Sequence, residues 1–138
     1  MNSRSILIVD DNEFNLKLME ALLETEGYLV KTALDAEEAM LALETFEPQL
    51  ILMDLQLPGM DGLELTRLLK QDPTRRRISI VALTASAMKG DEEKAIAAGC
   101  DGYLTKPIDT RSLPQSIAAY MNNRRDFEGA PASKKGRQ

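Results

Sequence analysis

The chain has 138 residues, of which 43% are hydrophobic and 28% charged, a balance that is typical of a soluble globular protein of one domain. It contains no apolar run near the roughly 18 residues of a membrane span, and its one cysteine excludes an internal disulfide. The absence of histidine excludes His-based catalytic triads and His-ligated metal sites, so any chemistry has to use carboxylates, hydroxyls and amines.

The net charge of −5 is unevenly distributed along the chain. Residues 122–138 contain five basic and two acidic residues, a net charge of +3, which leaves −8 on residues 1–121. An acidic body argues against nucleic acid as the main partner. The polar, Gly- and Pro-containing composition of residues 122–138 predicts a disordered basic tail. The lack of a secretory pattern at the N-terminus favours a cytoplasmic protein.

Short apolar runs alternate with helical patterns along residues 1–121. The predicted strands comprise residues 5–9, 28–33, 50–54, 78–83 and 102–105. The predicted helices lie around residues 18–23, 36–43, 63–69 and 89–98, and a last helix runs to about residue 121. Gly27 and Gly99 are expected to end the first and fourth helices. Either Asp109 or Ser112 caps the last helix, because Pro114 fits only a first turn.

Strands that alternate with helices predict an α/β protein with one parallel, doubly wound sheet and right-handed crossovers. The run Leu50–Met53 is apolar on both faces, which is typical of a strand buried between two layers of helices. Its last residue, Asp54, therefore lies at the edge of the sheet where open α/β folds bind their ligands.

Polar residues follow three of the other predicted strands at the same edge. They are Asp10, Asp11, Thr84 and Lys106. Taken singly, each is more simply explained as the cap of a helix or turn, but five such residues at the ends of parallel strands indicate a site. Three carboxylates in one place repel one another unless a proton or a cation neutralises them. Mg²⁺ fits, because it prefers oxygen ligands and is typically held by one or two carboxylates plus phosphate oxygens.

These residue types suit phosphoryl transfer. A carboxylate such as Asp54 can attack phosphorus and form an aspartyl-phosphate. The reaction depends mainly on positioning and on neutralising charge. A metal ion and the Lys106 ammonium would supply positive charge, and the Thr84 hydroxyl can donate a hydrogen bond to a phosphoryl oxygen.

The residues at these strand ends stand in four motifs: Val9-Asp10-Asp11, the run from Met53-Asp54 through Pro58-Gly59-Met60-Asp61-Gly62, Leu83-Thr84-Ala85, and Tyr103-Leu104-Thr105-Lys106-Pro107. Together these motifs resemble the receiver domain of bacterial two-component response regulators. The resemblance covers residues 5–121 and implies a flavodoxin-like sheet of order 2-1-3-4-5 with five helices.

The resemblance also implies roles for individual residues. Asp54 would be the phosphoacceptor, and Asp11, Asp54 and the backbone carbonyl of Gln56 would bind Mg²⁺, with Asp10 acting through a water molecule. Lys106, expected before a cis proline, would contact the phosphoryl group. Thr84 and Tyr103 would form the conformational switch, and Gln56 and Ser86 would influence the lifetime of the phosphoryl group.

In this family the phosphoryl donor is a histidine on a sensor kinase or a phosphotransfer protein, which agrees with a chain that has no histidine of its own. We therefore expect a phosphorylated signalling protein rather than an enzyme that turns over an external substrate. After residue 121 there is little room for an effector domain, so we expect a stand-alone receiver, similar to single-domain regulators of cell division or motility, that contacts a downstream protein. A receiver segment of a hybrid kinase or of a larger regulator is the alternative.

Two other classes are less compatible with the sequence. Phosphatases of the haloacid-dehalogenase type also use an aspartyl nucleophile, but they need a second Asp two positions later, where this chain has Gln56. A flavodoxin-like FMN carrier needs a phosphate-binding loop after the first strand, and Asp10-Asp11 occupies that position.

Overall fold

The computed structural model describes residues 4–85 and 89–129. Five strands and five helices alternate along the chain, as the sequence predicts. They are β1 (Ser5–Val9), α1 (Glu13–Thr25), β2 (Leu29–Ala33), α2 (Ala36–Leu43), β3 (Leu50–Asp54), α3 (Gly62–Gln71), β4 (Ser79–Thr84), α4 (Lys89–Ala98), β5 (Gly102–Thr105) and α5 (Leu113–Gly129).

All five strands are parallel and lie in the order β2-β1-β3-β4-β5, which confirms the predicted fold class and sheet order. Val9 of β1 pairs with Met53 of β3, so the residues that follow these two strands leave the sheet side by side. From β1 the chain continues to β2 on one side, and from β3 it continues to β4 on the other side. The gap between the ends of β1 and β3 is therefore the topological switch point, where open α/β sheets bind ligands.

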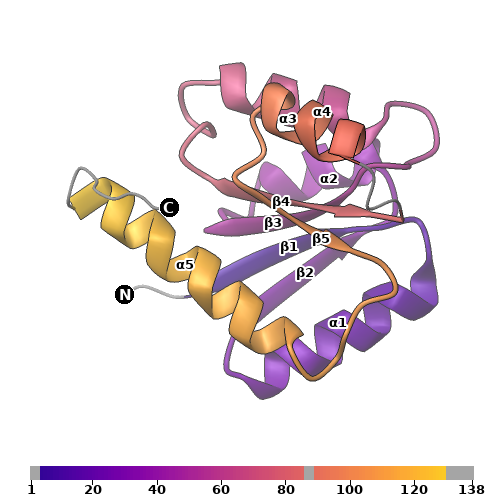
Figure 1. Ribbon diagram of the computed structural model, residues 1–138, viewed down its shortest axis with the longest axis vertical. Coiled ribbons are helices and arrows are strands. Elements are labelled where there is room, and N and C mark those ends of the chain that lie inside the picture. The colour runs from indigo at the N-terminus through magenta and orange to yellow at the C-terminus, as the bar shows by residue number, and fades with distance from the viewer. Residues whose placement is uncertain (1–3, 86–88, 130–138) are drawn as a thin grey trace.

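The sheet lies between two layers of helices: α1 and α5 cover one face, and α2, α3 and α4 cover the other (Figure 1). Side chains alternate between the faces along each strand. In β1, Ile6 and Ile8 pack in the core beneath α1 and α5, whereas Leu7 and Val9 pack in the core beneath α2 and α3. All residues of β1 and β3 are buried, so these central strands form a rigid base for the residues at their carboxyl ends.

Side-chain caps begin three of the helices. Asn12, Asp35 and Asp61 each accept a hydrogen bond from the backbone N–H three residues later. Gly27 and Gly99 end α1 and α4 at φ values of +95° and +110°, where a side chain would be strained, and this confirms both predicted stops.

The last helix differs from the prediction. It was expected to end near Met121 and to be followed by a disordered tail, but α5 continues to Gly129. Residues 122–128 contain neither Gly nor Pro, so nothing in their backbone chemistry ends the helix. Ser112 directly precedes α5, while Asp109 accepts bonds in the turn before it. Residues 130–138 of the predicted tail lie outside the described residues.

Among the residues that the structure describes, no helix combines the length and the apolar character that crossing a membrane requires.

Candidate functional site

Asp54, the last residue of β3, is 3% exposed, and both of its carboxylate oxygens are held. Oδ1 accepts a hydrogen bond of 3.0 Å from the backbone N–H of Gln56. Oδ2 accepts one of 3.1 Å from Nζ of Lys106. The first contact is local and follows from the turn after β3, whereas the second joins residues that are 52 positions apart in the chain.

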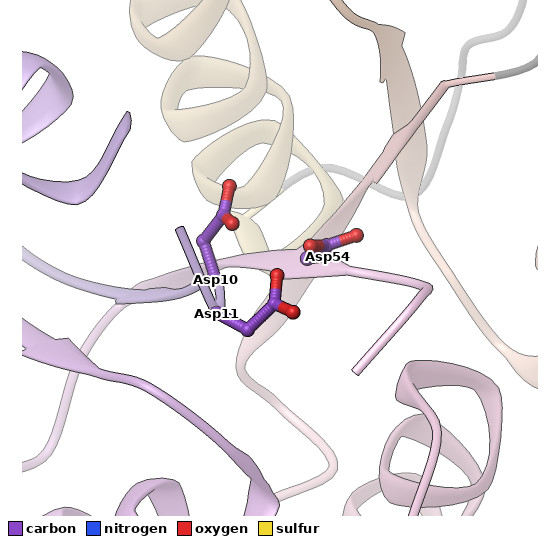
Figure 2. A group of neighbouring side chains, drawn as sticks. All are labelled: Asp10, Asp11 and Asp54. Carbon is purple, nitrogen blue, oxygen red and sulfur yellow. The ribbon is translucent and has the colours of Figure 1, made fainter. Parts of the chain in front are cut away.

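Asp10 and Asp11 follow β1 and differ in exposure. Asp10 is fully buried, and its Oδ1 accepts a 2.9 Å hydrogen bond from the backbone N–H of Asn12. Asp11 is exposed. Oxygens of Asp10, Asp11 and Asp54 all lie within 4.8 Å of one another, and Figure 2 shows the three carboxylates gathered at the ends of β1 and β3. The structure thus brings together the three acids that the sequence placed at this edge.

Lys106 reaches the carboxylates from the end of β5, on the far side of β4. Its Nζ lies 3.1 Å from Oδ2 of Asp54 and 3.2 Å from Oδ2 of Asp10. Its backbone N–H donates a 2.8 Å hydrogen bond to the carbonyl of Thr84, which aligns the ends of β4 and β5. The peptide bond from Lys106 to Pro107 is cis, as the resemblance implied. One cation is therefore shared between two buried anions.

The protonation of this cluster reflects burial and charge together. Burial raises the pKa of Asp54 above its ordinary value, and the negative charge of Asp10 adds to this, although the hydrogen bonds from Gln56 and Lys106 oppose it. Burial favours the neutral form of Lys106, but the hydrogen bond to Asp54 and the charges of both acids outweigh burial and raise the pKa of its ammonium. Lys106 therefore stays charged at neutral pH, and Asp54 is less readily ionised than an exposed aspartate.

The donor set fits a hard cation. Oδ2 of Asp10 is buried and, within the described part of the chain, receives no hydrogen bond, although the Lys106 ammonium lies 3.2 Å away. A buried carboxylate oxygen without a hydrogen bond is costly unless a cation or an ordered water molecule contacts it. Three carboxylates with a single lysine retain net negative charge, and oxygen ligands of this kind are those that Mg²⁺ prefers.

The remaining predicted residues lie near this cluster in different environments. Thr84 ends β4 and is 6% exposed. Tyr103 is half-buried on β5, opposite Ala82, and packs against the core on the α2, α3 and α4 side of the sheet. The side chain of Gln56 is exposed in the turn after β3. Ser86 lies outside the described residues.

Two residues that shape the site were given no role from the sequence, although Gly62 ends one of the quoted motifs. Asn12 caps α1 with its side chain and binds Asp10 with its backbone N–H, and its place between Asp-Asp and a helical pattern is the signal for the cap. Gly62, the first residue of α3, has no room for a side chain: a Cβ would lie 2.8 Å from Cα of Leu55 and closer still to the carbonyl oxygen of Asp54. Sequence spacing gives no signal for such a close approach.

The chain belongs to the response regulator receiver domain family, whose model matches residues 6–118. It is thus a receiver domain of two-component signalling, and the family suggested by the sequence is confirmed.

Among curated proteins, the chain is similar to the polar-differentiation response regulators DivK of Brucella ovis and Brucella anthropi. The sequences are 42% identical over 121 and 120 residues. The alignments cover 88% and 87% of this chain, and 98% of each relative.

Solved structures show the same fold. A CheY-like response regulator receiver domain from Methanospirillum hungatei superposes with a TM-score of 0.83 and 30% identity, over 91% of this chain and 99% of the other. The receiver domain of the sensor histidine kinase PA1611 from Pseudomonas aeruginosa gives a TM-score of 0.78 and 36% identity, over 88% of this chain and 99% of the other. In that structure a magnesium ion is coordinated in the active-site cleft.

Proposed function

We propose that this receiver accepts a phosphoryl group on the carboxylate of Asp54, with Mg²⁺ bound beside it, and passes the signal on through a protein–protein contact. The observation that carries the proposal is the convergence of three carboxylates and the Lys106 ammonium at the ends of β1, β3 and β5. A buried acid that pairs with an ammonium and lies beside two further carboxylates suits a nucleophile toward phosphorus.

The proposed step is a direct displacement. An oxygen of Asp54 forms a bond to phosphorus while the bond from phosphorus to the imidazole nitrogen of a phosphohistidine breaks. The nitrogen keeps the electron pair of the broken bond and takes up a proton from the solvent. The donor histidine belongs to a sensor kinase or a phosphotransfer protein, because this chain contains no histidine.

Side chains around Asp54 take separate parts in the step. We assign Asp11, Asp54 and the backbone carbonyl of Gln56 as Mg²⁺ ligands, with Asp10 acting through a water molecule. The ion, when bound, supplies positive charge beside the phosphoryl oxygens. The backbone of Lys106 is anchored to β4. Its ammonium can therefore leave the oxygen of Asp54 and pair with the incoming phosphoryl group while the backbone stays in place.

Thr84 and Tyr103 are the proposed switch. The Thr84 hydroxyl sits at the end of β4, next to the strand that carries Asp54, and can donate a hydrogen bond to a phosphoryl oxygen. Tyr103 lies two ladder positions earlier on the neighbouring strand and is half-buried, so its exposure can either rise or fall. A coupling of about 1–3 kcal/mol would change partner affinity by roughly 5- to 150-fold. Gln56, exposed beside the site, and Ser86 are proposed to set how long the phosphoryl group persists.

We infer that the protein works in the cytoplasm as a switch without an external substrate. The exposed amide of Gln56, two residues after Asp54, cannot donate and accept protons as an enzyme's acid would. The similarity to DivK, over almost the whole of that protein, supports a single-domain regulator whose output is a protein target.

Phosphorylation by acetyl phosphate with Mg²⁺ tests the proposal. Wild type should gain one phosphoryl group by intact-mass spectrometry, and Asp54→Asn should gain none. Asp61→Asn is the matched control, because Asp61 is a nearby acid that caps α3 and Asn is an equally good cap. Equal labelling of wild type and Asp54→Asn would refute the assignment. A kinase with a labelled histidine and a pull-down with the phosphorylated protein then identify the donor and the target.

A further inference from the structure

A tyrosine on α5 binds the exposed backbone edge of β5. β5 is an edge strand, with β4 on one side. Lys106 donates its backbone N–H toward β4, and N–H groups alternate sides along a strand, so the N–H of Tyr103 points away from the sheet. It donates a 3.3 Å hydrogen bond to the hydroxyl of Tyr120. A side chain of α5 thus takes the place of a neighbouring strand.

Gly102 makes this contact possible. A Cβ at this position would overlap the Tyr120 ring and lie 2.6 Å from its hydroxyl oxygen. The ring also packs against the core beneath α1 and α5. Tyr120 is therefore enclosed by the core, by the backbone of Gly102 and by the N–H of Tyr103, and it has little freedom to move independently of β5.

Tyr103 is consequently held from both faces of the sheet. Its side chain packs with the core on the α2, α3 and α4 side, and its backbone is bonded to α5, which covers the opposite face (Figure 1). A displacement of the Tyr103 backbone therefore changes the position or the hydrogen bonding of Tyr120.

We propose that Tyr120 is a positioning residue that couples α5 to Tyr103, so that phosphorylation of Asp54 alters α5 through the hydrogen bond between these two tyrosines. This inference rests on the proposed switch at Thr84 and Tyr103. It names the atom pair that connects α5 to that switch, the backbone N–H of Tyr103 and the hydroxyl of Tyr120.

The test compares Tyr120→Phe with wild type by NMR, in the full chain with Mg²⁺ and with or without beryllofluoride. The substitution removes the hydroxyl and keeps the ring. Amide exchange of Tyr103 should become about 5-fold faster, the effect of losing one hydrogen bond. Beryllofluoride should still shift the amide signal of Thr84, while its shifts in residues 113–121 should fall to about half or less of the wild-type values.

Two further variants make the result specific. Tyr28→Phe is the matched control, because Tyr28 is buried in the same core but lies directly before β2, and it should behave as wild type. Gly102→Ala should reproduce the effects of Tyr120→Phe, because the added methyl group displaces the ring. Two results for Tyr120→Phe would overturn the coupling. One is beryllofluoride-induced shifts in α5 as large as those of wild type, and the other is an unchanged rate of amide exchange at Tyr103. Loss of labelling at Asp54 in wild type would instead refute the proposed function, so the two failures are distinguishable.

Discussion

The ammonium of Lys106 lies 3.1 Å from Oδ2 of Asp54, although β4 separates the strands that carry the two residues. The same ammonium lies 3.2 Å from Asp10. This shared pairing keeps two buried acids in one site, at a cost that burial of their charges imposes on the folded state. The proposed binding of a further cation and of a phosphoryl group at this site would offset that cost.

That expense makes the stability of the protein depend on pH. Burial raises the pKa of Asp54, so the folded state holds this proton more tightly than the unfolded state does. The contribution of Asp54 to stability therefore falls as pH rises from 3.8, the ordinary value, through the raised pKa. In the presence of a chelator, Asp54→Asn should be more stable than wild type at pH 7, because the amide carries no charge that burial would penalise. The difference should shrink at pH 3, where both states of the wild type carry the proton. Urea denaturation at both pH values measures it, and an equal difference at the two would contradict the prediction.

Mg²⁺ should stabilise the folded protein, because the three acids come together only when β1 and β3 pair. At an ion concentration 100-fold above the dissociation constant, the free energy of unfolding should rise by about 2.7 kcal/mol. Asp11→Asn should lose most of this gain. Glu13→Gln, which removes an exposed acid on the first turn of α1, is the control and should keep it. Thermal denaturation with increasing Mg²⁺ tests the difference, and an equal response of the two variants would exclude Asp11 as a ligand.

Gly62→Ala should disturb the site through the backbone of β3. The new Cβ would meet Leu55 and the carbonyl of Asp54, neither of which can move aside as a flexible side chain could. We expect a loss of about 1–3 kcal/mol in the free energy of unfolding and weaker labelling of Asp54.

The matched substitution is Gly90→Ala, in α4, where a Cβ meets nothing within 4 Å. Alanine is the better helix former, so this variant should gain about 0.5–1 kcal/mol. Chemical denaturation of both variants gives the two values. A neutral effect at Gly62 would show that α3 can shift away from β3 without cost.

Cys100 should react slowly with thiol reagents. Burial raises the pKa of its thiol to about 11, from an ordinary value of 9.0. Because only the thiolate reacts, the reactive fraction at pH 8 should be roughly 100-fold lower than in the unfolded chain. Alkylation followed by mass spectrometry, with and without urea, checks this. Rapid labelling of the native protein would show that the loop before β5 opens readily.

The sequence was a good guide wherever a residue's environment follows from its neighbours in the chain. Apolar runs located the strands, and Gly27 and Gly99 located the ends of two helices. The prediction failed at the end of α5, because Asn122 and Asn123 lower helix propensity only slightly and no Gly or Pro follows until Gly129. The roles assigned to Asp54, Gln56 and Tyr103 remain predictions.

By itself, the sequence determined that five polar residues lie at one edge of a parallel sheet, because strand direction follows from the alternation of strands and helices. Only the tertiary structure decided how those residues differ. Asp10 is fully buried and Asp11 exposed, Lys106 reaches two acids across β4, and Tyr120 bonds the backbone of Tyr103. Burial and contacts of this kind depend on how helices pack on the sheet, and that packing joins residues far apart in the chain.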